Sequence, residues 1–144
     1  MPAIEPLCKL IETKLCHFTK EENFLIEADL FVRICEEIKG IFREKHQNYF
    51  CLMRYGKEKE NTVLDANFAK LIIQDILSTE EYNLNGITLY TNTCEDVIQE
   101  IIEGRNVNPS SNFLRRIIEL HNMVRPELYH AISKKIAAQY LTAS

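Results

Sequence analysis

A stripe of apolar residues at alternating steps of four and three constrains the fold of this chain more than any other feature. Its members are Phe24, Ala28, Phe31, Cys35, Ile38 and Phe42. This spacing keeps every member on one face of an α-helix, and such a face is stable only when it packs on another element. Thr19, with Glu22 three residues later, is typical of the capping box that begins a helix. The stripe therefore predicts one long amphipathic helix.

The stripe has two candidate packing partners. One is the rest of the same domain, which is the ordinary use of an amphipathic helix. The other is a second copy of the chain, since this spacing also suits a helix-to-helix seam. The residues of that homodimer seam would be Phe24, Phe31, Ile38 and Phe42.

Helical periodicity continues over most of the remaining chain. Residues 3–17 repeat apolar positions at helical spacing, and a last helix is expected from Pro126, because proline is favoured in a first helical turn. Residues 48–55 are ambiguous, since their aromatic and apolar density suits a short strand as well as a continued helix. Gly56 and the charged residues after it predict a loop. The fold class expected is mainly α, a helical bundle in which a short strand near 48–55 stays open.

The positions of these patterns predict two regions packed as one compact unit. Residues 1–60 form an N-terminal helical region for dimerisation or packing. Residues 61–144 hold several short helices joined by tight polar corners, which is the inventory of a helix-turn-helix domain. In this second region, Thr93 is expected to cap a helix that ends at Gly104. Ser110 or Ser111 is expected to cap the next helix.

Charge is distributed unevenly along the chain, although the formal net charge is only -4. Residues 1–63 carry ten Lys or Arg against eleven Asp or Glu, residues 64–104 carry one against eight, and residues 105–144 carry six against two. An acidic segment thus runs directly into a basic one, and such an asymmetry can orient a charged partner. Solvated helix surfaces would give the same asymmetry without any partner.

Several function classes lack their sequence signatures. The N-terminal apolar run is interrupted by charges, unlike a signal peptide, and no apolar stretch has the length of a transmembrane helix. Five cysteines at irregular spacings do not form metal-ligand pairs. The glycine loop of nucleotide sites, the paired histidines of metalloproteases and the nucleophile elbow are all missing. We therefore expect a cytoplasmic protein away from membranes that is no enzyme, with no catalytic residue, no metal site and no cofactor.

The stretch ITLYTNTCEDVIQEIIEGRNVNPSSNFLRRIIELHN, residues 87–122, resembles the phage-repressor type of helix-turn-helix, as in the Cro and lambda repressor group. Within residues 64–123 each part of that motif has a counterpart: the end of the first helix at 89–91, the reading helix at 93–103, the helix stop at Gly104, and the loop at Asn108, Pro109 and Ser110. The direct match covers a quarter of the chain. It implies a DNA-binding transcriptional regulator.

The resemblance also implies roles for individual side chains. A recognition helix presents its first residues to base edges in the major groove, and here these are Asn92, Thr93, Glu95, Asp96 and Gln99. Gln99 can pair with adenine, while Glu95 or Asp96 can accept a hydrogen bond from a cytosine amino group. Other side chains lie where the loop and the next helix would meet phosphates. These are Arg105, Asn106, Asn108, Ser110, Ser111, Arg115 and Arg116.

The charge of the reading helix departs from what DNA binding requires. It carries Glu95, Asp96, Glu100 and Glu103, and no Lys or Arg. Phosphate recognition depends on cations, so the arginines after this helix either supply that positive surface or pair with its carboxylates. The alternative function is therefore an acidic, all-helical protein-interaction module, such as an adaptor, an antiactivator or a secretion chaperone. Its partner would be a basic protein.

Overall fold

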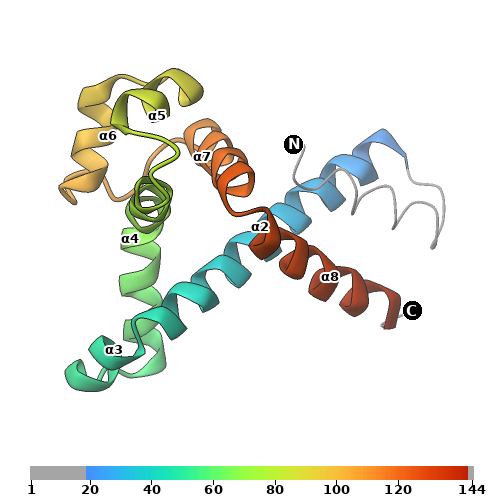
Figure 1. The fold of residues 1–144 in the computed structure, drawn as a ribbon. Helices are drawn as coiled ribbons and strands as arrows, with labels where there is room; N and C mark the ends of the chain where they lie inside the picture. Colours follow the sequence, from blue (N-terminus) through green and yellow to red (C-terminus); the bar gives the residue numbers. More distant parts are fainter. Residues whose placement is uncertain (1–18, 143–144) are drawn as a thin grey trace. The chain divides into compact units, whose positions relative to one another are not determined.

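The computed structural model describes residues 19–142 and, for side chains, residues 19–139, and every regular element in this range is an α-helix (Figure 1). The helices are α2 (Lys20–Lys45), α3 (Gln47–Met53), α4 (Lys57–Ser78), α5 (Leu84–Thr91), α6 (Glu95–Ile102), α7 (Ser111–Val124) and α8 (Pro126–Thr142). The predicted mainly α class is confirmed. The helix expected over residues 3–17 lies outside the described residues.

The described residues form two compact units. One unit is residues 39–124, and the other is residues 19–38 together with 125–142. The division falls inside α2, so this helix contributes residues to both units. The predicted boundary after residue 60 lies inside α4, which is continuous there.

Three predicted helix starts are confirmed by their capping contacts or bounds. The backbone N–H of Glu22 donates to Thr19 Oγ1 at 3.2 Å, so Thr19 caps the start of α2. Ser110 is the residue that caps α7, because its Oγ accepts from the backbone N–H of Phe113 at 3.2 Å. The last helix, α8, begins at Pro126. Local chemistry was sufficient to predict these three positions.

In the unit that contains α8, polar contacts join that helix to α2. Lys135 Nζ lies 2.9 Å from Glu37 Oε2, and Arg33 donates to the side-chain oxygen of Gln139 at 3.4 Å. The buried face of α8 consists of Tyr129, Ile132 and Ile136. Steps of three and four give these residues one side of the helix.

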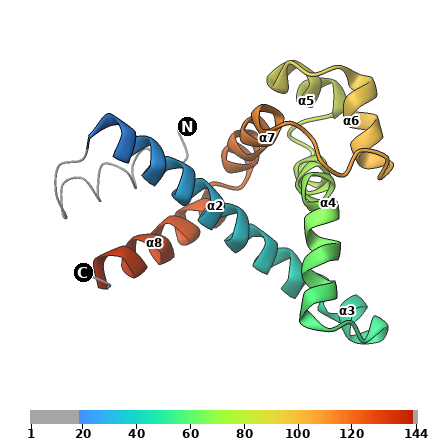
Figure 2. The same ribbon diagram turned by 180° about the vertical axis from the view of Figure 1, so that it is seen from behind.

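In the unit of residues 39–124, α4 is the central helix. It packs against α6 and α7, and α5 packs against α6 and α7 in turn. Figures 1 and 2, which view the chain from opposite sides, show α3 at one end of α4 and α5, α6 and α7 at the other. The buried residues of α4 are Leu64, Phe68, Ala69, Ile72, Ile73 and Ile76. Complete burial of one isoleucine stabilises the fold by about 1.5–3 kcal/mol, so this row dominates the core of the unit.

A buried polar pair joins α4 to α7. His121 is 1% exposed, and its Nε2 lies 2.7 Å from Asp75 Oδ2. Lys45 Nζ lies 3.8 Å from the other carboxylate oxygen of Asp75. A buried polar ring is costly without a hydrogen-bond partner, and Asp75 supplies that partner.

The short strand allowed for residues 48–55 is wrong, because residues 47–53 form α3. A strand needs a neighbouring strand for its backbone hydrogen bonds, and the described residues contain none. A helix forms its backbone hydrogen bonds within its own segment, so α3 needs no such neighbour. Phe50 is its one buried residue. The predicted loop after Gly56 is also wrong. Gly56 is itself the N-cap of α4. Glu58 and Glu60 stabilise the first turn, because negative charge interacts favourably with the N-terminal end of the helix dipole.

The stripe on α2 is buried unevenly. Ile38 and Phe42 are buried in the single chain, Phe31 is half-buried, and Phe24 is 69% exposed. The C-terminal half of the stripe therefore packs within its own chain. The homodimer seam stays a prediction. Of its four residues, Phe24 is the one exposed enough to contact a second copy without rearrangement of the chain.

We predict that Asp75→Ala lowers the free energy of unfolding by about 1–3 kcal/mol, because it leaves the buried His121 ring without its partner. Urea denaturation measures this loss. Asp65→Ala is the matched control: Asp65 pairs with Lys39 at 2.7 Å, but its side chain is 61% exposed. An exposed pair contributes at most about 1 kcal/mol, so equal losses in the two variants would contradict the prediction.

Candidate functional site

A three-residue connection joins α5 to α6, as a helix-turn-helix requires. Asn92 takes the left-handed conformation, with φ 51° and ψ 45°, which asparagine adopts more readily than most residues. The N–H of Thr93 donates to the carbonyl of Thr88 at 3.2 Å, completing the Schellman type of helix end. Cys94 returns to extended backbone and Glu95 begins α6.

Buried side chains hold α5 and α6 in place. Ile87 and Thr91 face inward from α5, and Ile98 and Ile101 do so from α6. The Thr91 hydroxyl donates to the carbonyl of Ile87 at 2.7 Å, so its burial leaves no unpaired donor. This arrangement places the N-terminus of α6 at the surface.

The predicted base-contacting residues separate into an exposed group and an engaged group. Asn92, Glu95 and Asp96 are exposed around the start of α6. Thr93 is half-buried, and its hydroxyl donates back to the carbonyl of Thr91 at 3.1 Å. Gln99 is half-buried, and its amide donates to Glu103 at 3.2 Å. The structure therefore brings together three of the five residues as a free surface.

Thr93 does not cap α6, which corrects the predicted start of this helix. Its hydroxyl is directed toward α5, and Cys94 occupies the N-cap without a side-chain hydrogen bond to the helix. Glu95 and Asp96 in the first turn compensate for the missing side-chain cap, because their negative charges interact favourably with the helix dipole. At the other end, Gly104 has a φ of 79° and ends the helix region where predicted.

Most of the predicted phosphate-contacting residues already have partners inside the chain. Arg105 lies 2.6 Å from the Glu103 carboxylate, and Arg115 is also engaged. Asn106 accepts from the backbone N–H of Asn108 at 3.2 Å, and Asn108 lines a hollow beside Lys39. Ser110 caps α7, as described above, whereas Ser111 is exposed on its first turn.

Arg116 is a predicted phosphate contact that lies beside the turn. It is exposed, and its guanidinium donates to the carbonyl of Thr91 over 3.4 Å, which is a weak bond. Thr91 is the last residue of α5, immediately before Asn92. A positive charge therefore lies next to the connection between the two helices.

The carboxylates of α6 are only partly compensated. Hydrogen bonds from Arg105 and Gln99 hold the pKa of the Glu103 carboxyl below its usual value, so Glu103 is ionised near neutral pH. Glu95, Asp96 and Glu100 form no ion pair with any described residue. The exposed face of α6 is consequently negative.

Leu89 is a surface residue that sequence reasoning missed. It is 75% exposed on α5, opposite the buried Ile87 and Thr91. The signal was present, since a residue two positions from each of two buried helical residues must point away from the core.

Comparison of the chain with models of protein families, with curated proteins and with solved structures finds no match. Between residues 19 and 142, no helix is long and apolar enough to cross a membrane. In the same range, no three His, Cys, Asp or Glu side chains gather in an arrangement that could hold a metal ion.

We predict that Asn92→Val destabilises the protein by about 1–2 kcal/mol, because a β-branched residue resists the left-handed conformation. Asn92→Gly should preserve stability, since glycine adopts this conformation freely. Asn85→Val, on the exposed side of α5, is the control and should change stability by no more than about 0.5 kcal/mol. Thermal unfolding compares the three variants, and a loss at Asn85 as large as that at Asn92 would refute the role of the turn.

Proposed function

We propose that this chain is a DNA-binding regulator whose helix-turn-helix consists of α5, the turn at Asn92 and α6. The observation that carries the proposal is the left-handed Asn92 between two short helices, with the start of the second helix exposed. α4 and α7 support this pair from behind through the buried core.

In this proposal the exposed start of α6 reads bases and the surrounding residues contact the DNA backbone. Glu95 and Asp96 accept from cytosine amino groups, and the Asn92 amide contacts a neighbouring base edge. Arg116 and Ser111 contact phosphates, because one lies beside the turn and the other on the exposed first turn of α7.

The negative face of α6 limits the affinity that one copy can reach. Glu103 is compensated by Arg105, but Glu95, Asp96 and Glu100 repel phosphates wherever they do not contact a base. Two copies on adjacent half-sites would double the favourable contacts, as in many regulators with this motif. Homodimerisation is therefore part of the proposal.

We predict that Arg116→Glu weakens binding to a mixed-sequence DNA duplex and reduces the slope of log affinity against log salt by at least about 1. Fluorescence anisotropy across a salt series measures both quantities. Lys59→Glu provides the same charge change at an exposed position in the first turn of α4. Absence of binding at low salt, or an equal effect of Lys59→Glu, would rule out DNA contact through this turn.

A second candidate function is recognition of a basic protein segment by the same surface. The observations that favour it are the exposed Leu89 on α5 and the negative exposed face of α6, which packs against α5, because an apolar anchor and acidic groups suit a basic amphipathic helix. The carboxylates then attract the partner, and the engaged arginines have a structural role.

The two functions predict opposite effects of neutralising the start of α6. The Glu95→Gln, Asp96→Asn double variant should raise non-specific DNA affinity by up to about fivefold, since each charge at roughly 8 Å in water contributes about 0.5 kcal/mol. It should weaken binding of a Lys- and Leu-rich helical peptide if the partner is a protein. The Glu80→Gln, Glu81→Gln double variant, at exposed positions before α5, controls for the change in total charge.

A further inference from the structure

A pocket of about 590 Å³ lies where the end of α2, one face of α3 and the start of α4 meet, within residues 39–124. This volume is in the range of small-molecule sites. Phe50 and Tyr55 line it, with ring centroids 6.4 Å apart, and Tyr49 contacts both rings edge-on at 5.5 and 6.2 Å. Phe50 and Tyr55 form the aromatic wall of the pocket, and the contact of Tyr49 with both rings holds this wall in place.

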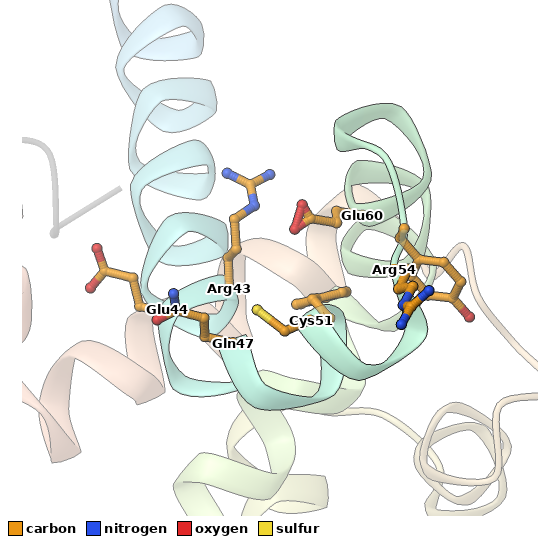
Figure 3. A pocket seen from close by; sticks show the side chains of 8 residues that line it. Arg43, Glu44, Gln47, Cys51, Arg54 and Glu60 are labelled. Atoms are coloured by element: carbon orange, nitrogen blue, oxygen red, sulfur yellow. The ribbon is translucent and has the colours of Figure 1, made fainter.

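Two opposite charges extend into the space of this pocket. Figure 3 shows Arg43 reaching from α2 and Glu60 from α4, while Cys51 of α3 lies between the two helices. The Glu44 carboxylate is directed away from Arg43 in the same view. Neither Arg43 nor Glu60 forms an ion pair with another described residue.

Arg43 retains an unused donor inside the pocket region. One terminal nitrogen donates to the side-chain oxygen of Asn61, which holds the guanidinium in place. Its Nε is buried and has no hydrogen-bond partner among the described residues. The other terminal nitrogen forms no hydrogen bond with a described residue, so it is the donor left for a ligand.

We propose that this pocket binds a small zwitterionic molecule of the α-amino-acid class. The carboxylate of the ligand accepts from Arg43, whose planar guanidinium matches carboxylate geometry. The ammonium group of the ligand donates to Glu60. The ligand side chain lies against the aromatic wall formed by Phe50 and Tyr55.

The charges lining the pocket favour a zwitterion over a simple anion. Arg43 and Arg54 are balanced by Glu44 and Glu60, so the lining has no formal net charge. A phosphate or a simple carboxylate would satisfy Arg43 but would leave Glu60 unpaired and repelled. A ligand with both charges pairs each of the two facing groups. This proposal concerns small-molecule binding alone and does not rest on DNA recognition.

Thermal unfolding of the full chain with each standard L-amino acid at millimolar concentration tests the proposal. We expect at least one free amino acid to raise Tm by on the order of 5 °C at a hundredfold excess over its Kd. Its amide lacks the carboxylate and its N-acetyl derivative lacks the ammonium group, so neither should raise Tm.

Glu60→Gln should abolish the ligand-induced shift, because it removes the partner of the ammonium group. Glu58→Gln is the matched control, since Glu58 is exposed in the same first turn of α4 but does not line the pocket. It should retain the full shift. The proposal is overturned if no free amino acid raises Tm, if the N-acetyl derivative is equally effective, or if Glu60→Gln responds like the unaltered chain.

Discussion

Burial of one face of α4 is the constraint on which the unit of residues 39–124 depends. α6 and α7 pack directly on this helix, whereas α5 reaches the core through its contacts with α6 and α7. The two short helices α5 and α6 therefore have no independent core. Each has eight residues, too few for an isolated helix to be stable in water. The exposed start of α6 is held in position because the row from Leu64 to Ile76 is buried behind it.

Helical periodicity and capping chemistry were sufficient to predict most of the fold. These signals are local, since a cap such as Ser110 bonds within the first turn of its own helix. The error at residues 48–55 arose because a strand is defined by a neighbour, which a short apolar run does not reveal. The start of α6 was predicted one residue too early, because a threonine hydroxyl can either accept from the first turn of the next helix or donate to a preceding carbonyl. Thr93 donates to the carbonyl of Thr91.

The candidate site was predicted in its residues but not in its pairings. The carboxylates of α6 and the arginines after it are evident in the sequence, whereas the contact between Arg105 and Glu103 depends on how the chain turns at Gly104. The pocket near α3 was not predictable for the same reason. Arg43 and Glu60 face one another only because a short helix reverses the chain between them.

The length of the connection between Thr91 and Glu95 is constrained by core packing, whereas the exposed residues at the start of α6 are not. An α-helix turns by about 100° per residue, so one inserted or deleted residue that continued the helical path would rotate α6 relative to α5 by that angle. Ile98 and Ile101 would then leave the core, and Glu95 and Asp96 would no longer be at the surface. Exchange of the exposed residues at the start of α6 leaves the core intact. Substitution on this surface can therefore change its charge and shape without loss of the fold, while the length of the turn is fixed by the packing behind it.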